Sequence, residues 1–386
     1  MIYADNAATT RLSDSAFEKM LPFLQEQFGN PSSQYSHGMR AKRAIDHARK
    51  QIATAIGVES SEIVFTSSGS ETNSWVLRGI ADAFNSDTIH IITSSIEHHS
   101  VLNVCRTLEL KSVEVTYLPV DSCGCVSIDN LKKAIKSNTK LVSIMLANNE
   151  IGTIQPISEI GMYLRGLNIL FHTDAVQAVG HIPVDVNQLY VDFLTASAHK
   201  FNGPKGTGIL YHRSGTKLPS LIFGGEQEHG NRSGTENVAG IVATGYALEE
   251  SVAQIVETTE RLNTMIDMTV TDIRTRFPSV RINGDTENRL PGIVNFGFDG
   301  VSGESMMNLL DLKGICISTG SACTSGKDMP SHVLLALGQT EEQAKSAIRI
   351  SYGRLNTEKE AKMVAEVVCN IFAKMTSVSA KADARK

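Results

Sequence analysis

Short apolar runs alternate with amphipathic stretches over the middle of this chain, and this alternation is the strongest constraint on its fold. The stretches SVLNVCRTLEL (100–110) and ISEIGMYLRGL (157–167) carry apolar residues at helical spacing. Nearly continuous apolar strands separated by helices are typical of an α/β fold with a mostly parallel sheet covered on both faces. The expected strands lie at 62–65, 89–93, 141–146, 168–174, 192–197 and 208–212.

Polar clusters directly follow most of these runs. Ligands of open α/β sheets bind beyond the carboxyl ends of the strands, and those ends meet at one edge of a parallel sheet. We therefore expect a single pocket to collect the clusters TSSGSETN (66–73), SSIEHHS (94–100), ANNEIG (147–152), HTDAVQ (172–177) and SAHK (197–200).

A second, smaller α+β domain is expected after the glycine-rich loop FGGEQEHGNRSGTEN (223–237). A helical pattern without proline follows this loop and runs over about 236–276. The polar tail SVSAKADARK (377–386) is expected to fray. The predicted division is a large domain at 15–260, and a small domain made of 1–14 plus 261–386 with the N-terminal arm completing its layer.

Composition excludes several classes of protein. With 386 residues, 41% of them hydrophobic and 20% charged, the chain is typical of a soluble globular protein. The formal net charge of -5 argues against general nucleic-acid binding, which needs a basic surplus or patch. No apolar run is long enough to span a membrane, and the N-terminus MIYADNAATT does not resemble a secretion signal, so we expect a cytoplasmic protein without a membrane partner. The six cysteines show no CxxC spacing, so no zinc site or disulfide framework is indicated.

Two of the strand-end clusters suit a phosphorylated heterocycle. IVFTSSGSETNS is a strand that turns through Gly69 and Ser70 into a helix, and free amides at a helix N-terminus suit a phosphate. An N-cap with a glycine turn is the alternative. In HTDAVQ, Asp174 and Gln177 follow a buried strand, where a carboxylate is costly unless it meets a partner such as a protonated ring nitrogen. An N-cap or a surface salt bridge is the alternative there.

Histidine and lysine add proton-transfer and amine chemistry to the same edge. Of His98 and His99, adjacent in the chain and therefore pointing apart, at most one is expected in the pocket, and a capping histidine is the alternative. Lys200 follows the apolar run DFLT closely, so its amine is expected at the pocket floor, where partial desolvation favours a Schiff base with an aldehyde. Lys205 lies in a Gly-Pro-Lys-Gly turn and is expected at the surface.

Cysteine and arginine residues further along the chain complete the set. Cys323 lies in the polar, glycine-rich stretch STGSACTSGK, which suits a thiol that must be reached and must travel. Cys316 in GICIS is expected in the core, and the CGC of 123–125 in a turn. Arg349 is the lone charge in AIRISYG, where its fork suits a carboxylate, with an ordinary salt bridge as the alternative. A phosphate turn, aspartate, histidine, lysine and arginine are together the parts of a pyridoxal-phosphate enzyme.

The order and spacing of these motifs resemble a known family. ADNAATT, FGNPSS, SIEHHSVL, NNEIGTIQPI, HTDAVQAVG, SAHKFNGPKG, TEN after NRSG, and STGSACTSG are similar to the cysteine desulfurases of the NifS and IscS type, which belong to the class V aminotransferase family. The similarity runs from about residue 2 to 372. The SACTSG context matches the long-loop group of these enzymes.

The resemblance implies a homodimer of the aspartate aminotransferase fold (fold type I) that binds pyridoxal 5'-phosphate (PLP). It implies that Lys200 holds the cofactor covalently, His98 stacks on its ring, Asp174 keeps the ring nitrogen protonated and Gln177 bonds the ring oxygen. Asn149 is expected beside the cofactor and, with Arg349, on the substrate carboxylate. The phosphate contacts are expected from Gly69, Ser70, Ser197, His199 and Thr235 of the partner subunit.

The implied reaction converts L-cysteine to L-alanine and leaves the sulfur on Cys323 as a persulfide. The sulfur then passes to an acceptor protein for iron-sulfur cluster assembly, tRNA thiolation or DNA phosphorothioation. A selenocysteine lyase or an aminotransferase of the same fold is the alternative, and Cys323 would then be dispensable for its natural reaction. The chain departs from the family at Ser68, where glycine is common, and at Asn73 and Ser74, where aspartate-asparagine or two asparagines are common, so the fine geometry of the phosphate turn is open.

Overall fold

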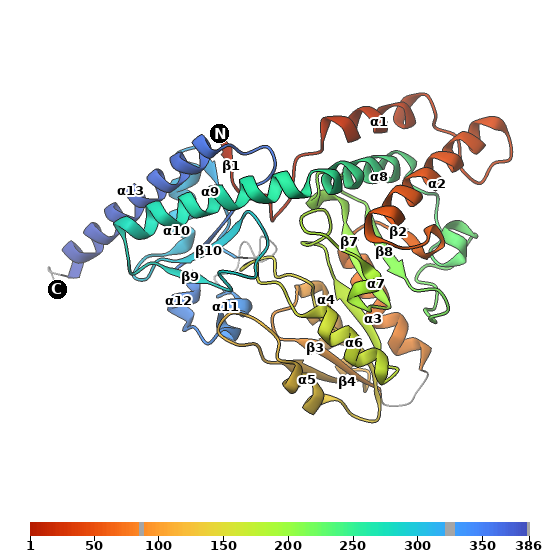
Figure 1. The fold of residues 1–386 in the computed structure, drawn as a ribbon, viewed down its shortest axis with the longest axis horizontal. Coiled ribbons are helices and arrows are strands. Elements are labelled where there is room, and N and C mark those ends of the chain that lie inside the picture. Colours follow the sequence, from red (N-terminus) through yellow and green to blue (C-terminus); the bar gives the residue numbers. More distant parts are fainter. Residues whose placement is uncertain (85–88, 321–328, 384–386) are drawn as a thin grey trace.

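A large mixed sheet forms the centre of the fold. The computed structural model describes residues 1–84, 89–320 and 329–383, and within them a seven-stranded sheet has the order β2-β8-β7-β6-β5-β3-β4 (Figure 1). In that sheet β8 runs antiparallel to both of its neighbours, and the other pairings are parallel. The strands are β2 (Ile63–Thr66), β3 (His90–Ser94), β4 (Glu114–Leu118), β5 (Thr139–Ser143), β6 (Leu170–Asp174), β7 (Phe193–Ser197) and β8 (Gly208–His212).

The expected mostly parallel sheet is confirmed, and one strand was missed. Each of the six predicted runs overlaps a strand of the sheet. The missed strand is β4, which pairs only with β3 at the sheet edge and is half-buried along most of its length. Its sequence EVTYL places polar residues between apolar ones, because an edge strand does not need a continuous apolar run.

Helices cover both faces of the sheet, and alternate strand residues feed the two apolar cores. Ile63 and Phe65 of β2 pack in one core with residues of α2, α6 and α8, whereas Val64 packs in the other with residues of α3 and α4. The helices of this part are α1 (Asp14–Gln25), α2 (Ser36–Ile56), α3 (Gly69–Ala83), α4 (His99–Glu109), α5 (Ile128–Ala134), α6 (Ile157–Gly166), α7 (Val186–Leu189) and α8 (Val238–Ala253), with short 3-10 turns η1 (Ser60–Glu62), η2 (Ala198–Lys200) and η3 (Gln227–Gly230).

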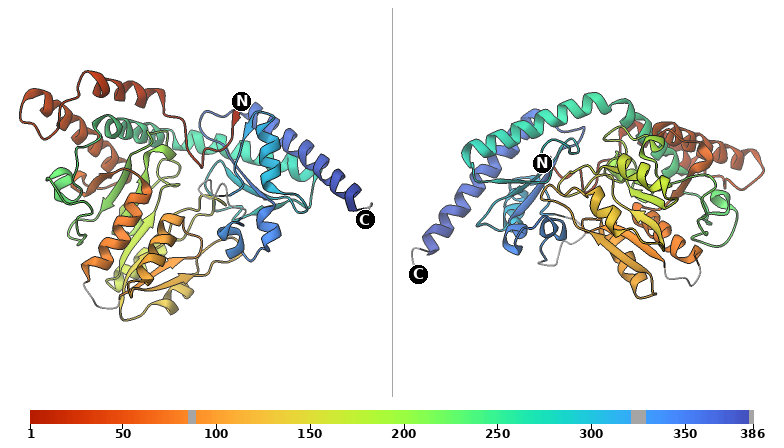
Figure 2. Two further views of the ribbon diagram at one scale, coloured as in Figure 1. Left: turned by 180° about the vertical axis from the view of Figure 1, so that it is seen from behind. Right: turned by 60° about the horizontal axis from the view of Figure 1, so that its bottom comes forward.

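The long helical pattern predicted over 236–276 is two helices rather than one. Helix α8 ends at Ala253, and α9 (Ile255–Arg276) begins after Gln254, whose φ of -106° and ψ of 4° are not helical. Apolar periodicity continues on both sides of this break, and no glycine or proline marks it in the sequence. Helix α9 leads from the large sheet to the C-terminal part of the chain (Figures 1 and 2).

A second apolar core gathers both ends of the chain. It joins Ile2 and Ala4 of the N-terminal arm to residues of α9 and of the C-terminal strands and helices, as expected for the arm. A three-stranded antiparallel sheet has the order β12-β10-β9, and β1 pairs in parallel with β11. The elements are β1 (Ile2–Tyr3), β9 (Arg281–Asn283), β10 (Ile293–Gly297), β11 (Ile315–Cys316), β12 (Ala347–Ser351), α10 (Gly303–Asp311), α11 (His332–Ala336), α12 (Glu341–Lys345) and α13 (Glu358–Asp383).

The sequence predicts a frayed C-terminal tail and a domain division at 260/261. The backbone of α13 stays helical to Asp383, so the expectation of a frayed tail from residue 377 is wrong over most of its length. The domain division at 260/261 stays a prediction, and α9 runs through it. Among the described residues, no helix is both long and apolar enough to cross a membrane.

A buried ion pair holds the glycine-rich loop 223–237 against β2. Arg49 of α2 donates from both guanidinium ends to the Glu228 carboxylate at 2.8 Å, and the two side chains are 8% and 3% exposed. Glu228 also accepts the Phe65 N–H at 2.9 Å, and the guanidinium lies 4.8 Å from the centre of the Phe65 ring. The bidentate geometry and the added backbone bond offset the cost of burying two charges.

We expect Glu228→Gln to lower the free energy of unfolding by about 3 kcal/mol, because it leaves the buried Arg49 charge without a counter-charge. The matched control is Asp14→Asn in the exposed Arg11–Asp14 pair, where the loss is expected below about 1 kcal/mol. Urea unfolding followed by circular dichroism measures both. Equal losses in the two variants would show that the loop is held by other contacts.

Candidate active site

One cavity at the carboxyl edge of the large sheet collects most of the predicted site residues. Ten of them line it, together with Ala7 and Ala8 of the N-terminal arm and with Asn73, Ser100 and Met145, which the sequence had not marked as site residues. The expectation of one pocket fed by the strand ends is thereby confirmed. The ten predicted residues are Gly69, Ser70, His98, Asn149, Asp174, Gln177, Ser197, His199, Lys200 and Arg349.

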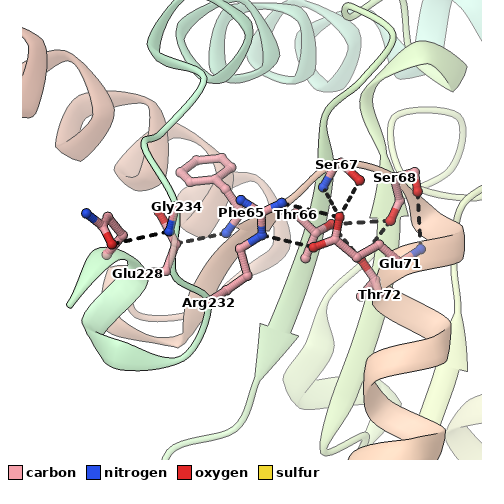
Figure 3. Close-up of polar contacts among 10 residues, drawn as sticks. Phe65, Thr66, Ser67, Ser68, Glu71, Thr72, Glu228, Arg232 and Gly234 are labelled. Carbon is pink, nitrogen blue, oxygen red and sulfur yellow. Dashed lines mark hydrogen bonds and ion pairs between the residues drawn. The ribbon is translucent and has the colours of Figure 1, made fainter. Parts of the chain in front are cut away.

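The turn between β2 and α3 presents the start of a helix to the cavity. The Ser68 hydroxyl caps α3 by accepting the Glu71 N–H at 3.1 Å, and Gly69 and Ser70 form the first turn behind it. Thr66 and Thr72 share a hydrogen bond of 2.7 Å between their hydroxyls, which ties the strand end to the helix (Figure 3). The capping alternative is therefore correct for Ser68, and the cap at the same time orients the free amides that suit an anion.

The neighbouring strand β8 approaches this turn so closely that only glycine fits. A Cβ atom added to Gly208 would lie 2.4 Å from Thr66 Oγ1 and 2.6 Å from the Ser68 carbonyl carbon. Both distances are far below van der Waals contact, so any larger residue would push the turn toward the cavity or unpair the strands. The shape of the turn thus depends on β8 as well as on its own sequence.

An ion pair ties the same turn to the glycine-rich loop. Glu71 turns from the start of α3 toward Arg232 (Figure 3) and accepts its Nε–H at 2.9 Å, while its second oxygen accepts the Ser67 N–H at 2.9 Å and the Ser67 hydroxyl. Burial raises the pKa of Glu71, but the hydrogen bonds from Arg232 and Ser67 outweigh it and hold the pKa below its usual value. Glu71 is therefore ionised at neutral pH.

The Lys200 amine reaches the cavity at the end of η2, as its position after β7 predicts. Its Nζ donates to the carbonyl oxygens of Ala7 at 2.6 Å and Ala8 at 2.8 Å, and the Gln177 amide donates to the same Ala7 oxygen at 2.9 Å. Sequence reasoning missed Ala7 and Ala8 because backbone carbonyls leave no signature in side-chain type. Lys205 is exposed, as expected.

Half-buried histidines flank Lys200 without adding charge. His181 donates from Nε2 to the Lys200 carbonyl at 2.9 Å, and burial lowers its pKa. Burial, followed by Lys200 and Lys205, lowers the pKa of His199 to about 4. Both rings are therefore neutral at pH 7, so His199 can offer the cavity a hydrogen bond but not a positive charge.

A hydrogen-bonded chain of four side chains also lines the cavity. Asp174 Oδ1 accepts the Val176 N–H at 3.0 Å, and Oδ2 accepts from Asn73 Nδ2 at 2.6 Å. Asn73 Nδ2 also donates to Ser100 Oγ at 2.9 Å, and Ser100 Oγ lies 2.8 Å from His98 Nδ1. His98 caps α4 by accepting the Ser100 N–H at 3.1 Å, so here too the capping residue faces the cavity.

His99 and Arg349 are placed differently relative to the cavity. His99 turns away from the cavity and packs edge-on against His332 at 4.7 Å between ring centres, so one histidine of the pair faces the cavity, as predicted. Arg349 is 1% exposed, donates to the Asn149 carbonyl at 2.8 Å and pairs with Asp5 at 2.7 Å. The salt-bridge alternative is therefore correct for Arg349, although the side chain also lines the cavity.

Two predicted site residues are not brought into this cavity. Thr235 is exposed on the glycine-rich loop and does not line the cavity of its own subunit. Cys323 lies outside the described residues. Cys316 on β11 is half-buried and is not a core residue, whereas its chain neighbours Ile315 and Ile317 are buried in the core. Gly124, with φ of 79°, turns the chain between Cys123 and Cys125 as expected.

Comparison with known proteins agrees with this geometry. The Aminotransferase class-V family matches residues 2–364. The cysteine desulfurase IscS of Dictyoglomus turgidum is 48% identical over 378 residues, which cover 98% of this chain and 96% of the relative. The chain belongs to the cysteine desulfurases of the class-V aminotransferase family. Its fold matches the solved structure of a NifS-like protein with a TM-score of 0.91 and 39% identity, covering 96% of this chain and 99% of that one. It also matches SspA in complex with cysteine with a TM-score of 0.82 and 37% identity, covering 91% and 98%.

Enzymes of this family depend on PLP, and the residues around the cavity fit that group. A primary amine, a buried carboxylate with both oxygens already oriented, and a helix N-terminus held tight by Gly208 converge there. An aldehyde requires an amine, a protonated pyridine nitrogen requires a hydrogen-bond acceptor with negative charge, and a phosphate requires N–H donors. The cavity therefore has a matching partner for each polar end of the cofactor.

We expect Gly208→Ala to weaken PLP binding by at least about tenfold, because the added methyl group displaces the turn at Thr66 and Ser68. Gly166→Ala is the control, since a Cβ atom there meets nothing within 4 Å and lies at the end of helix α6. Titration of the apoprotein with PLP, followed by absorbance, measures the dissociation constants. Equal constants in both variants would mean that the turn does not hold the phosphate.

Proposed function

We propose that this enzyme is a PLP-dependent cysteine desulfurase that converts L-cysteine to L-alanine and collects the sulfur on Cys323. The observation that carries the proposal is the convergence of Lys200, Asp174 and the α3 N-terminus on one cavity in a chain that belongs to this family. The match to SspA in complex with cysteine supports cysteine as the substrate class.

The residues that would hold PLP follow from the cavity lining. Bound there, PLP supplies an aldehyde that condenses with amines and a protonated ring that withdraws electrons from the substrate α-carbon. Lys200 offers the amine, Asp174 the counter-charge for the ring nitrogen, Gln177 a hydrogen bond to the ring oxygen, and His98 a flat ring to stack. The phosphate group would be held by Gly69, Ser70, Ser197, His199 and Thr235 of the partner subunit, with Asn149 beside the ring.

Lys200 and Asp174 would have different roles in the reaction, because different groups hold them. The Lys200 amine is held by two carbonyl oxygens that can release it, so it can move protons at the α-carbon once substrate is bound. The Asp174 carboxylate is oriented by two N–H donors, a backbone amide and a side-chain amide, which keep it in one place. The amine would thus handle protons, and the carboxylate would maintain charge.

Arg349 and Asn149, which both line the cavity, would receive the substrate carboxylate. Arg349 donates from Nη2 to Asp5 Oδ1 at 2.7 Å and from Nη1 to the Asn149 carbonyl at 2.8 Å, and its Nε has no hydrogen-bond partner in the described part of the chain. The guanidinium has five N–H groups and these bonds use two of them, so it can donate to a second carboxylate without giving up the first. Substrate orientation would follow from this contact.

The sulfur step would take place between the substrate and the Cys323 thiolate. The thiolate attacks the substrate sulfur, the S–S bond forms, and the Cβ–S bond breaks with its electron pair left on carbon. A proton transferred to that carbon completes L-alanine, and Cys323 carries the persulfide. A sulfur-acceptor protein in the cytoplasm would take the sulfur onward.

A second copy of the chain is the proposed partner that completes the site. Phe17, Leu21 and Leu24 lie on one face of α1 at helical spacing and are 49%, 43% and 53% exposed, and Phe223 on the glycine-rich loop is 86% exposed. Exposed apolar residues grouped in this way are typical of an interface. A homodimer built on these surfaces would account for the exposed position of Thr235 outside its own cavity.

We expect Cys323→Ala to keep the yellow colour of bound PLP but to abolish both alanine and protein-bound persulfide formation from L-cysteine, because the sulfur acceptor is gone. Cys316→Ala is the matched control, since Cys316 is half-buried on β11 away from the cavity, and it should retain both products. Amino-acid analysis and persulfide alkylation measure the products. Undiminished alanine formation by Cys323→Ala would favour a lyase or aminotransferase instead.

We expect subunit mixing to restore activity between two inactive variants, Lys200→Ala and Thr235→Ala. If Thr235 serves the partner subunit's cavity, the mixed dimer has one cavity with both residues intact and recovers up to about half of the wild-type rate per dimer, since one site in two is whole. If Thr235 serves its own cavity, no cavity is whole in any combination. Alanine formation before and after subunit exchange separates the two cases.

A further inference from the structure

Asn73 links the two side chains that the proposed function places against the cofactor ring. It is 1% exposed on α3, one turn after Gly69, and its Nδ2 donates one hydrogen to Asp174 Oδ2 and the other to Ser100 Oγ. A single amide group thus contacts the carboxylate at the end of β6 and, through Ser100, the imidazole at the start of α4. The following inference rests on the proposed PLP chemistry of this cavity.

The orientation of the Asn73 amide is fixed by Asp174. A flipped amide would place its carbonyl oxygen 2.6 Å from a carboxylate oxygen, where both atoms are acceptors and repel. In the observed orientation Asn73 Oδ1 is buried and has no hydrogen-bond partner in the described residues. A buried carbonyl oxygen without a partner is destabilising. The amide is therefore arranged to donate to its two neighbours at the expense of its own oxygen.

At Asp174 this arrangement fixes the position of the carboxylate. Oδ1 accepts a backbone N–H and Oδ2 accepts the amide, so the group cannot rotate without losing a bond. Neither donor can give up its proton to the carboxylate, because peptide and carboxamide N–H groups do not ionise in this pH range. The lone pairs that remain on Asp174 are then available to a protonated ring nitrogen in the cavity.

At His98 the arrangement fixes which ring nitrogen carries a proton. Ser100 N–H points at Nδ1 at 3.1 Å, so Nδ1 is an acceptor. Ser100 Oγ accepts from Asn73 and lies 2.8 Å from the same Nδ1, to which its hydroxyl can donate. A proton on Nδ1 would face the Ser100 N–H, so the geometry favours a neutral ring with its proton on Nε2.

We propose that Asn73 is a positioning residue that sets Asp174 as a fixed carboxylate and His98 as a neutral, Nε2-protonated imidazole, and thereby couples the two sides of the cofactor ring. It acts through these two side chains and through Ser100. Its substitution should change how tightly PLP binds and how that binding depends on pH, beyond any effect on folding.

Other ionisable groups surround this network, and the test must separate them from it. Burial, ahead of its other causes, raises the pKa of Glu97 to about 8, so this neighbour of Asp174 is mostly protonated at neutral pH. Comparing each variant with the wild type at the same pH cancels the contributions that both share. The groups that face the network or share its cavity are Glu97, His99, Glu150, His199, His332, Lys200 and Arg349.

The experiment compares four apoprotein variants with the wild type. Each is titrated with PLP between pH 6 and 9, a range that includes the ordinary pKa of histidine. Asn73→Ala removes both bonds, and Ser100→Ala removes only the branch to His98. Asn73→Asp is nearly isosteric and has a hydrogen to donate only when protonated. Val76→Ala is the control, because Val76 is fully buried on the same helix but contacts a different core.

The expected results differ in kind among the variants. Asn73→Ala should raise the PLP dissociation constant by roughly tenfold, and Ser100→Ala by a smaller factor of about two to three, since Asp174 keeps its amide donor. For Asn73→Asp, the ratio of its dissociation constant to that of the wild type should fall as pH falls. The reason is that a carboxyl group beside Asp174 takes up a proton and then donates it to Oδ2. The absorbance spectrum of bound PLP should change in the same order.

Each outcome bears on the proposal. If Asn73→Ala and Val76→Ala bind PLP alike, or if Asn73→Asp shows a pH-independent ratio, Asn73 has only a structural role and the inference is wrong. If the wild type itself binds no PLP, the proposed function falls and this inference falls with it. A failure of Asn73→Ala to fold leaves the Asn73→Asp ratio and the Ser100→Ala comparison to decide the question.

Discussion

The parallel pairing of β3, β5, β6 and β7 is the constraint on which the site depends. Parallel strands end at the same edge, so the residues that follow them are brought together whatever their distance in the sequence. Asp174 closes β6, Ser197 closes β7, and His98 follows β3 and begins α4. The reversed strand β8 contributes differently, because Gly208 presses against the phosphate turn from the side and sets its shape.

Two residues that cap helices also line the cavity. Ser68 caps α3 and His98 caps α4, and both line the cavity, so the structural and functional interpretations of each residue are not alternatives. The same holds for Arg349, which is in a salt bridge and also in the cavity wall. A helix that starts at the cavity edge needs a polar first residue for its own amides, and that residue faces the ligand side by necessity.

The sequence was sufficient to predict the sheet and the helices that cover it. It was also sufficient to predict the charged or titratable residues that directly follow an apolar strand. Lys200, Asp174 and His98 could be predicted because a charged or titratable group that follows an apolar run needs a reason to be there. Ala7 and Ala8 could not, since they contribute carbonyl oxygens that every residue has. Asn73 left a weak signal, its four-residue spacing from Gly69, which places both on one face of α3. The break at Gln254 left none, because helical periodicity persists on both sides of it.

The cavity is completed only when most of the chain has been synthesised, because the N-terminal arm forms part of its wall together with β12. Ala7 and Ala8 hold Lys200, and Arg349 pairs with Asp5, so the wall of the cavity joins positions near both ends of the sequence. A nascent chain on the ribosome exposes the phosphate turn early, yet its cavity remains open until β12 has emerged and paired beside the arm. The cavity therefore takes its final geometry late in biosynthesis, and products truncated before β12 lack one wall of the site.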